Sequence, residues 1–575
     1  MKEESTERKL KFVLMCNGPE LQQWQQEALN KLLNEGHASL QLIVMKTEEP
    51  MPQQGLVKKL ISYPWNRLFF NKYYQYFFRA SALKTVSIDE HLKYAAVLRC
   101  GVLKKGKYSE YFSDSDIEII KSFRPDFILK FGFGILRGKI LEAAPYGIWS
   151  FHHGDEQKFR GVPPAFYEIL KKEQVTASIL QQLTEKLDGG IILRKGYFPT
   201  ISHSWKANLE QALKFSVNWP ADVCRELALN GNLNRDMAGA TTSAPVYKVP
   251  GNITMLKFML RSLYNRVYFH LFEIFRAETW QTGLIQFPAA SWPVTAKIII
   301  DPREVKWLKA GKRRKYFADG FSTELYDRLL LLYEDYCYSV RKASIAASWF
   351  HLTEKNFSKT FTALSESWHL SYPFLFTHKK KTYCIPESLS HGSIELYELD
   401  THSGQLKYVR PLVEGLAAAD PSLLCYEDRW YLFFTPPHAT NTELQLWHAD
   451  TLDGPFVPHV LSPVKADVRN ARPAGGFITQ GDKLYRPAQD CSQTYGGRVI
   501  LNEITALSAT QFSETAVAVV EPPKGYRGLH TLSFAGNYLY FDVKNFTFVP
   551  SATLFQLFKR LGIAKSAKSN SGYDK

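Results

Sequence analysis

Short apolar runs alternate with amphipathic segments over roughly the first 235 residues, which is the pattern of an α/β domain. Residues 11–17 predict a buried strand, residues 19–36 have helical spacing and end at a glycine, and residues 40–45 predict the next strand. This order indicates a βαβ opening and a sheet with parallel strands.

Two further strands are predicted in this region, and the second of them ends in polar residues. Residues 116–123 have helical spacing, Pro125 stops the helix, and residues 126–134 predict an apolar strand that closes with two glycines. The next predicted strand, GIWSFHH at residues 147–153, ends in two histidines. Because open α/β sheets bind ligands at the carboxyl edge of their parallel strands, we expect these histidines to lie at a ligand site.

From about Trp280 the pattern changes to many short strands. Runs of β-branched and aromatic residues are separated by Gly, Asp, Asn and Pro. Five segments look alike and are each followed by a hairpin pattern, and they start at Phe317, Ser371, Ala419, Ala471 and Leu529. This repetition predicts an all-β five-bladed propeller in which one inner strand of each blade faces a central channel.

The chain is therefore predicted to be multidomain. We assign residues 1–240 to an α/β Rossmann-like domain with an insertion at about 51–84, residues 241–279 to a helical linker, residues 280–548 to the propeller, and residues 549–575 to a basic C-terminal tail. The length of 575 residues and the 45% hydrophobic content agree with large folded cores.

The net charge and the cysteines limit the possible binding partners and cofactors only in part. A net charge of +15 suits nucleic acid, an anionic membrane surface or phosphorylated substrates, but no nucleic-acid-binding signature accompanies it. The seven cysteines are odd in number and lack CxxC spacing, which favours buried free thiols over disulfides or a zinc site. No signal-peptide core and no apolar stretch of about 20 residues is present, so we expect a cytoplasmic protein.

Two segments of the first domain contain residues of the types that catalyse reactions: GIWSFHHGDEQKFRGVPP at residues 147–164 and LDGGIIL from Leu187. In their order and spacing they resemble the catalytic domain of the formyl-tetrahydrofolate-dependent formyltransferases, which include the methionyl-tRNA, glycinamide ribonucleotide and sugar-nucleotide enzymes. His152 matches the family's catalytic His, Arg160 and Gly161 match its Arg-Gly, and Asp188 matches its Asp-x-Gly.

The resemblance implies 10-formyltetrahydrofolate as the cofactor and an amine as the acceptor. It also implies that a protonated His152 stabilises the oxyanion, and that Asp188 raises the basicity of His152 or receives the amine proton. Arg160 and Gly161 would contact a substrate phosphate or shape the loop.

One position departs from the family, because Ser150 stands where the family has Asn. A hydroxyl is shorter than an amide and has one donor hydrogen in place of two. Losing one oxyanion donor costs on the order of 10²-fold in rate, so the activity is reduced, re-tuned or lost. His153, Asp155 and Glu156 are candidates to compensate, and a role at the loop edge without catalysis is the alternative.

Three segments interleave large aromatic residues with Lys and Arg. They are the insertion at 51–84, a stretch from Leu256 and a stretch from Leu554. Amphipathic helices of this kind lie on anionic membrane surfaces, which would place the protein at the inner face of a membrane. Helices that pack between domains or subunits have the same composition, and this second interpretation stays open.

The second half contains the strings SYPFLF, ADPSL, ARPAGG and YRPAQD. These resemble the five-bladed propeller domain of plant glucosamine inositolphosphorylceramide transferases and, more distantly, five-bladed glycoside hydrolases. The resemblance implies that polar residues converge on the channel, namely Asp319, Glu387, Asp420, Arg472, Gln489, Asp490 and His530. Asp319 and Asp420 match two of the hydrolase carboxylates, whereas Arg472 and Pro473 occupy the place of the fourth-blade acid.

A simple hydrolase is disfavoured on this basis. Glycoside hydrolysis uses two carboxyl groups of which one stays protonated, and a nearby Arg472 would lower carboxyl pKa values. Glu387 or Asp490 could act as a relocated acid, or the channel could bind a sugar phosphate without cleaving it.

We therefore expect a formyltransferase that acts on an amino sugar or nucleotide-linked amino sugar in polysaccharide biosynthesis, with a propeller that binds or modifies carbohydrate. No metal and no nucleic acid are expected, and the oligomeric state stays open. The alternative places glycosyltransferase or glycosidase chemistry in the propeller, beside a degenerate formyltransferase domain.

Overall fold

A computed structural model describes residues 9–47, 63–106, 108–186, 189–231, 233, 242–287, 296–308, 310–311 and 314–560 of the chain. The chain divides into two compact units, Met1–Val267 and Tyr268–Lys575, and the division falls inside helix α9 (Asn252–Phe275). Each unit has its own hydrophobic clusters. The predicted insertion lies in part outside the described residues, and so does most of the C-terminal tail.

The first unit is built on a seven-stranded sheet in the order β13-β12-β10-β8-β1-β3-β5. Its strands are β1 (Leu10–Cys16), β3 (Ala38–Lys46), β5 (Ala96–Cys100), β8 (Phe127–Lys130), β10 (Ile148–His152), β12 (Val175–Gln182) and β13 (Ile191–Pro199). The five strands from β10 to β5 are parallel, as the sequence predicted, whereas β12 and β13 extend the sheet in antiparallel fashion.

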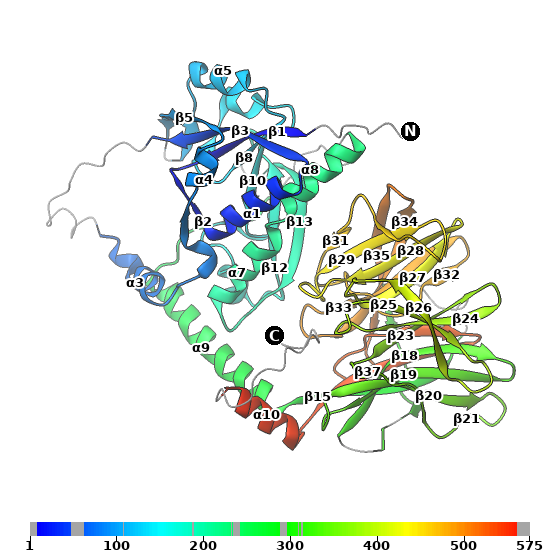
Figure 1. The fold of residues 1–575 in the computed structure, drawn as a ribbon. Coiled ribbons are helices and arrows are strands. Elements are labelled where there is room, and N and C mark those ends of the chain that lie inside the picture. Colours follow the sequence, from blue (N-terminus) through cyan, green and yellow to red (C-terminus); the bar gives the residue numbers. More distant parts are fainter. Residues whose placement is uncertain are drawn as a thin grey trace, which may run out of the picture. The chain divides into compact units, whose positions relative to one another are not determined.

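Helices cover both faces of this sheet (Figure 1). The alternate residues of β1 point to opposite faces, as in any strand. Phe12 and Leu14 pack with α1 (Gln23–Asn34), α7 (Trp205–Ser216) and α8 (Trp219–Asn230). Val13 and Met15 pack with α5 (Asp114–Ser122) and the 3₁₀ helix η3 (Gly138–Glu142). This is the three-layer arrangement of a Rossmann-like domain.

Helix α1 begins later than its pattern predicted. Residues 20–22 form strand β2 (Glu20–Gln22), which pairs with β4 (Thr85–Ser87). The Gln22 and Gln25 side chains form a capping box, which satisfies free backbone N–H groups at the helix start. Residues 20–22, which the pattern predicted to be helical, are therefore a strand because they pair with β4.

Smaller elements complete the first unit. They are η1 (Trp65–Arg67), α3 (Leu68–Tyr76), η2 (Ser81–Leu83), α4 (Asp89–Leu92), β6 (Leu103–Lys105), β7 (Ser109–Tyr111), β9 (Ile135–Leu136), β11 (Arg160–Gly161), α6 (Tyr167–Lys171) and β14 (Val246–Tyr247).

The second unit contains five separate antiparallel sheets among its described residues. Four of these sheets consist of strands that follow one another along the chain. The first runs from β18 (Lys315–Leu325) to β22 (Phe361–Leu364), and the second from β23 (Ser371–His378) to β26 (Leu406–Val413). The third runs from β27 (Ala419–Tyr426) to β31 (Lys465–Ala466), and the fourth from β32 (Ile478–Gln480) to β35 (Phe512–Glu521), where β16 (Lys297–Ile299) pairs with β35 in parallel. The fifth combines β36 (Leu532–Ala535) and β37 (Tyr538–Thr547) with β15 (Ala277–Gln286) and β17 (Lys306–Leu308).

The strands between these bounds are β19 (Arg328–Cys337), β20 (Lys342–His351), β21 (Asn356–Phe357), β24 (Lys381–Glu387), β25 (Ile394–Leu399), β28 (Arg429–Thr435), β29 (Glu443–Ala449), β30 (Val457–Pro458), β33 (Lys483–Asp490) and β34 (Arg498–Leu507). Helix α10 (Pro550–Arg560) follows the last strand.

The first strands of successive sheets lie next to one another. Strand β18 contacts β23 and β36, and β23 contacts β27. Sheets that follow chain order and meet through their first strands form a propeller, and β15 closes the ring by pairing with β37 over its full length. The predicted inner segment at Ala471 is the exception, since its residues make isolated bridges before the short strand β32.

All seven cysteines are described and none forms a disulfide. Five are buried, Cys337 is half-buried and Cys425 is exposed. The expectation of buried thiols is therefore wrong for Cys425.

Candidate functional site

His152 ends strand β10 at the carboxyl edge of the parallel sheet, where the sequence placed it. Its Nε2 lies 3.3 Å from the carbonyl oxygen of Phe159, and a carbonyl can only accept, so Nε2 carries a hydrogen in this contact. Gly154 lies against the ring, because a Cβ there would be 3.2 Å from Nε2 and 2.7 Å from the Phe159 oxygen. A glycine at this position therefore lets the loop approach the imidazole.

Ser150, two residues earlier, is buried and pairs in register with Lys130 of β8. Register partners in a parallel pair point to the same face of the sheet. Burial lowers the pKa of Lys130 to about 8; Glu110 opposes this shift and Lys46 adds to it. The sequence analysis missed Lys130, and its signal was a single cation at the end of an otherwise apolar strand.

Two further charged residues accompany Lys130 at this edge. Lys46 ends the parallel strand β3, and its Nζ lies 2.5 Å from Glu110 Oε1. Glu110 also accepts the backbone N–H of Gly134 at 2.7 Å. Glu110 is therefore engaged by Lys46 and the loop, and among the described residues no acceptor lies within hydrogen-bonding distance of Lys130 Nζ.

His153 points away from the role that the sequence suggested. Its ring packs on Trp24 and Phe151, and its Nδ1 lies 3.1 Å from Ser178 Oγ. Ser178 donates its hydroxyl hydrogen to the Ala212 carbonyl at 3.1 Å, so Nδ1 must donate to Ser178 and Nε2 is left as an acceptor. Burial lowers the pKa of His153 to about 3, so the ring is neutral. It cannot replace the missing oxyanion donor, and that expectation was wrong.

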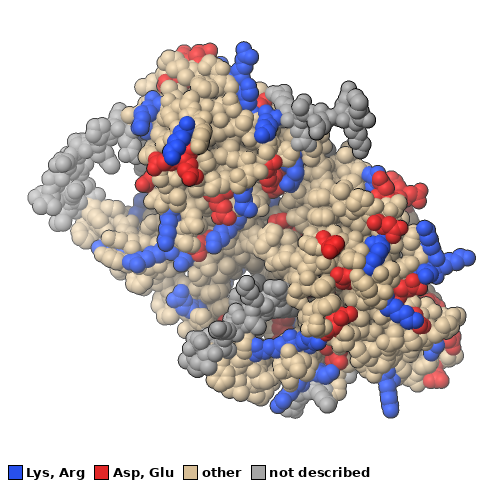
Figure 2. Space-filling model, viewed as in Figure 1, with Lys and Arg blue, Asp and Glu red and all other residues tan. Residues whose placement is uncertain are grey.

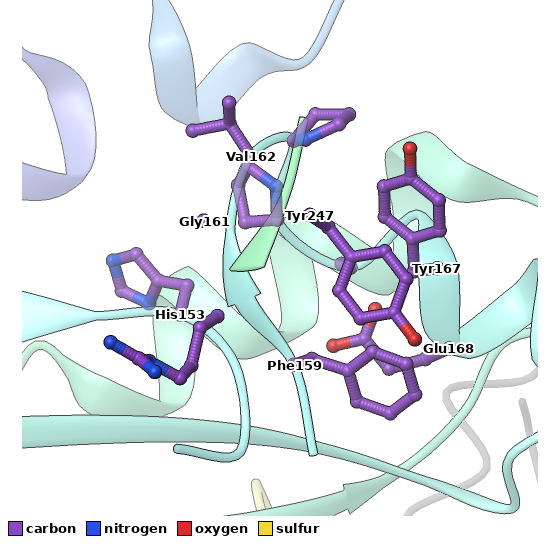
Figure 3. Close-up of a pocket in the computed structure, with 11 residues that line it drawn as sticks. His153, Phe159, Gly161, Val162, Tyr167, Glu168 and Tyr247 are labelled. Carbon is purple, nitrogen blue, oxygen red and sulfur yellow. The ribbon is translucent and has the colours of Figure 1, made fainter. Parts of the chain in front are cut away.

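A small pocket of ≈ 10 Å³, about one water molecule in size, is lined in part by Phe159, whose carbonyl oxygen contacts His152 Nε2. His153 and Glu168 both line it, together with Phe159, Gly161 and Tyr247 (Figure 3). Glu168 is buried and its Oε1 has no hydrogen-bond partner among the described residues, and the same holds for Nε2 of His153.

Glu168 has an unusual acidity for a carboxyl group. Burial raises its pKa to about 7, its own backbone N–H opposes the shift, and the charges of Glu173 and Asp155 add to it. A group with this pKa exchanges a proton near neutral pH. Sequence reasoning missed Glu168, because a glutamate in a short helix carries no signal of its own.

Asp155 and Glu156 are held by Lys195. Lys195 Nζ lies 3.0 Å from Asp155 Oδ1 and 2.7 Å from Glu156 Oε2. Burial acts to raise the pKa of Asp155, but the charge and hydrogen bond of Lys195 outweigh burial and lower the pKa overall, so the carboxylate is ionised. This ion-pair cluster fixes the loop after His153, and the role of Asp155 in substrate binding stays a prediction.

Arg160 and Gly161 form β11, which pairs with β14. Arg160 Nη1 donates to the carbonyl of Ala244 at 3.3 Å. Gly161 has φ +92°, and a Cβ there would lie 2.1 Å from the Tyr247 carbonyl oxygen. Of the two roles that the sequence left open, this contact supports loop architecture. Asp188, the predicted partner of His152, lies outside the described residues.

In the second unit, the first strands of three sheets share one irregularity. The pairing of each strand shifts register at a β-bulge, and the bulged residues Asp319, Tyr372 and Asp420 have φ values of +51°, +44° and +48°. Bulges re-aim side chains. All three side chains are buried and contact residues of neighbouring sheets.

Arg472 connects Asp420 and Glu387. Its Nε and Nη2 donate to the two oxygens of Asp420 at 2.6 and 3.2 Å, and Nη2 lies 3.8 Å from Glu387 Oε2. Gln489 donates to Asp420 at 2.8 Å, and Glu387 accepts the Asp420 backbone N–H at 2.9 Å. Three sheets therefore meet in one buried polar network.

Asp319 and His530 form a second part of the centre, together with Asp542. His530 Nδ1 lies 2.6 Å from Asp542 Oδ2, and Nε2 lies 3.3 Å from Asp319 Oδ1. Burial acts to lower the pKa of His530, but Asp542 and Asp319 raise it overall, which favours the protonated ring. The three ligand atoms would also fit a cation, whereas an imidazolium between two carboxylates already accounts for their geometry.

Arg472 lowers the pKa values of the nearby carboxyl groups, as expected, but burial has the larger effect. Burial raises the pKa of Glu387 well above its usual range, Asp420 adds to this, and Arg472 only opposes it. Burial likewise raises the pKa of Asp319 to about 6, against the opposing charge of His530. Desolvation outweighs the nearby cations here.

Asp490 takes a different place from the one predicted. It accepts from Arg498 Nε at 2.8 Å and from the backbone N–H of Ser492 at 2.9 Å. It thus joins strands within its own sheet. Glu334, which the sequence analysis did not single out, is buried, and Asp319 and Glu387 are among the charges that raise its pKa.

A larger pocket of ≈ 280 Å³ lies in the second unit, where residues of β25 and β26 face the segment that precedes β23. Its lining residues are aromatic and acidic: Glu366, Trp368, His391, Glu395, Tyr397 and Tyr408. The Trp368 ring stacks on His391 at 4.0 Å, and buried Trp368 Nε1 and Glu395 Oε2 have no hydrogen-bond partner among the described residues. His369, next to Trp368, lies 3.6 Å from Glu334 and so links the pocket to the buried carboxyl groups.

Comparison with known proteins gives separate matches for different parts of the chain. Residues 268–533 match the family model described as glucosamine inositolphosphorylceramide transferase 1, N-terminal. The glucosamine inositolphosphorylceramide transferase 1 of Oryza sativa subsp. japonica is 30% identical over 246 residues, which cover 41% of this chain and 32% of the relative.

A methionyl-tRNA formyltransferase of Anaplasma marginale is 27% identical over 165 residues, which cover 28% of this chain and 55% of the relative. The chain thus spans about a third of the length of the rice relative and about half of this formyltransferase.

Among solved structures, the family 117 glycoside hydrolase Zg3597 of Zobellia galactanivorans aligns with a TM-score of 0.31 and 12% identity, over 47% of this chain and 91% of the hydrolase. Glycinamide ribonucleotide transformylase 1 of Symbiobacterium toebii aligns with a TM-score of 0.27 and 13% identity, over 41% of this chain and 95% of the transformylase. The chain therefore combines similarity to the methionyl-tRNA formyltransferases with a segment, residues 268–533, that is similar to the N-terminal domain of glucosamine inositolphosphorylceramide transferase 1.

Proposed function

We propose that the first unit transfers a formyl group from 10-formyltetrahydrofolate to the amine of an amino sugar or nucleotide-linked amino sugar. The observation that carries this proposal is the pocket lined by His153 and Glu168, because His153 Nε2 and Glu168 Oε1 are both buried and have no hydrogen-bond partner among the described residues. Both atoms are acceptors, so they suit the N–H groups of an amine. The pocket has room for a group about the size of water, which agrees with an amino group.

The residues at the sheet edge fit the chemistry of acyl transfer. The cofactor would supply the formyl group. Lys130 would present its ammonium group at the edge where negative charge develops on the carbonyl oxygen, and Ser150 would add a hydroxyl. His152 Nε2 donates to the Phe159 carbonyl in this structure, and the oxyanion would take the place of that carbonyl as the acceptor. Glu168 accepts a proton from the acceptor amine, because its pKa of about 7 makes both of its states accessible at neutral pH.

A sugar acceptor is favoured by the second unit. The name of the matched family contains glucosamine, an amino sugar. The ≈ 280 Å³ pocket combines aromatic faces, which stack on sugar rings, with carboxylates, which accept from hydroxyl and amino groups. We interpret the five sheets as the five blades of a propeller that holds the glycan.

The test is to incubate the full chain with 10-formyltetrahydrofolate and a panel of nucleotide amino sugars and to follow tetrahydrofolate release. We expect release with at least one sugar, and loss of release in His152→Ala. Lys139→Met, at an exposed surface site outside both pockets, is the control and should retain the reaction. Release that persists in His152→Ala, or that occurs with none of the amines, contradicts the proposal.

A second candidate function is glycosyltransferase or glycosidase chemistry in the propeller. It is favoured by the raised pKa values of Glu387 and Asp319, since glycoside chemistry needs one carboxyl group that stays protonated. If it is correct, aryl glycosides of amino sugars should be cleaved or used as donors, and Glu387→Gln should abolish this while leaving tetrahydrofolate release intact.

A further inference from the structure

Helix α9 has an apolar face that no described residue covers. In its first-unit part, Ile253, Leu256, Leu260, Leu263, Tyr264 and Val267 are exposed and recur at intervals of three and four residues, so they form one stripe. Leu260 is 62% exposed and Tyr264 is 70% exposed. The opposite face holds Met255 and Phe258, which are fully buried.

Helix α3 lies beside the start of α9 and has the same character. The Asn252 side chain accepts from Phe69 N at 3.1 Å and donates to the Trp65 carbonyl at 2.8 Å. Tyr73 of α3 packs edge-on against Phe258 at 6.2 Å. On its outer side, α3 and the turn before it expose Trp65, Phe69, Tyr76 and Phe77. We call the exposed residues of both helices the α3–α9 face.

Basic residues border this face. Residues 63–88 contain Arg67, Lys72, Arg79 and Lys84 but no Asp or Glu, and residues 252–272 contain Lys257, Arg261 and Arg266 but no Asp or Glu. Lys257 and Arg266 are exposed. Figure 2 shows Lys and Arg side chains over the region of α3 and α9. An apolar stripe with a cationic border matches an anionic lipid surface, where acyl chains receive the stripe and headgroups pair with the border.

A second copy of the chain is a weaker occupant. Two α3–α9 faces would bring their basic borders together without an acidic residue in either helix segment to pair with them. Aromatic residues with polar tips, such as Trp65 and Tyr264, are the types that gather at lipid headgroups. Within the described residues, no helix combines the length and the apolar character that crossing a bilayer requires.

We propose that the α3–α9 face docks the protein on an anionic membrane surface, with α9 lying in the plane of the headgroups. Docking of this kind would hold the chain at a lipid-linked substrate. The proposal is independent of the chemistry in either unit.

The test is flotation of the full chain with vesicles of phosphatidylcholine alone and of phosphatidylcholine mixed with phosphatidylserine. We expect binding to the anionic vesicles that weakens as salt is raised. The double variant Leu260→Glu, Leu263→Glu should weaken this binding about tenfold or more, because it places charge in the stripe. The matched control is the double variant Ile299→Glu, Val340→Glu, which adds the same charge at two apolar residues that are 67% and 69% exposed in the second unit, and it should bind like the unmodified chain.

Three outcomes would overturn the proposal. One is the absence of binding to anionic vesicles, and another is equal binding by the double variant and the unmodified chain. The third is a concentration-dependent dimer in analytical ultracentrifugation that the double variant disperses, which would assign the face to a second copy. Since the substituted leucines are exposed, the double variant should unfold at the same temperature as the unmodified chain, and circular dichroism checks this.

Discussion

Lys130 stands beside Ser150 in the register of the parallel strands β8 and β10. Lys130 ends β8, and Ser150 lies two residues before His152, which ends β10. In the formyltransferase family an Asn donor stands in place of Ser150. Lys130 is desolvated and has no hydrogen-bonding partner among the described residues, so it can supply the charge that a serine hydroxyl lacks. The first prediction follows from this pair.

Lys130→Met should lower kcat for formyl transfer on the order of 10²-fold while KM for the amine changes little. The pKa of Lys130 is lowered to about 8, so its charge is lost as the pH rises through 8 and the rate should fall there. Because the folded protein holds the ammonium at a cost, the same variant should raise Tm at pH 7. If Lys130→Met leaves both kcat and the alkaline limb of the pH–rate profile unchanged, Lys130 has no part in the mechanism. The control is Lys139→Met, which changes a lysine at an exposed surface site.

Glu168→Gln should remove the acid limb of the pH–rate profile near pH 7. The folded-state pKa of Glu168 is raised to about 7, so the ionised form is disfavoured by folding. Its contribution to stability is therefore present at low pH and is lost as the pH rises from about 4.5 through 7. We expect Glu168→Gln to stabilise the fold at pH 8 relative to pH 5, and denaturant titrations at the two pH values measure this. Equal effects at both would show that the carboxyl group does not titrate in this window.

Gly161→Ala should destabilise the first unit by about 1–3 kcal/mol, since it combines a strained φ with a clash on the Tyr247 carbonyl. Gly36→Ala is the matched control, because Gly36 has φ +81° but nothing within 4 Å of an added Cβ. It should cost about 1 kcal/mol or less. Chemical denaturation of the two variants separates the clash from the backbone conformation, and equal losses would contradict the contact with Tyr247.

Arg472→Met should cost about 3–5 kcal/mol of unfolding free energy, because it leaves Asp420 and Glu387 buried beside each other without their cation. Lys483→Met removes the exposed ion pair with Glu503 and should cost at most about 1 kcal/mol. Urea titration followed by tryptophan fluorescence compares them. A loss for Arg472→Met as small as that of the control would mean that the neighbouring carboxyl groups take up protons and remain neutral.

Trp368→Ala should abolish binding of amino sugars to the second unit, whereas Glu395→Gln should weaken glucosamine more than glucose. The indole offers a stacking face, and the carboxylate attracts an ammonium group. Isothermal titration with both sugars tests this. Equal weakening of both sugars by Glu395→Gln would show that the pocket reads hydroxyl groups only.

Much of the architecture was accessible from residue patterns. The alternation of apolar and polar runs predicted the parallel strands β1, β3, β8 and β10, because burial on both faces of such a strand demands continuous apolar residues. The strands β12 and β13 were not predicted, and their antiparallel direction depends on partners far along the chain.

The candidate sites were accessible only in part. His152 and Asp420 stand in recognisable strings, and the structure places them at a sheet edge and on an inner strand. The importance of Lys130 and Glu168 comes from desolvation, which is set by packing that no local spacing reveals. The same effect reversed the acidity expected for Glu387 beside Arg472.

Strand β15 and strand β37 are partners along all ten residue pairs from Ala277↔Thr547 to Gln286↔Tyr538. During synthesis, β15 therefore leaves the ribosome long before β37 and cannot pair with it until the propeller sequence is almost complete. Until then one of its edges offers unpaired N–H and C=O groups to other nascent chains. Chains that stop short of residue 538 would keep that edge permanently and should be recovered as aggregates.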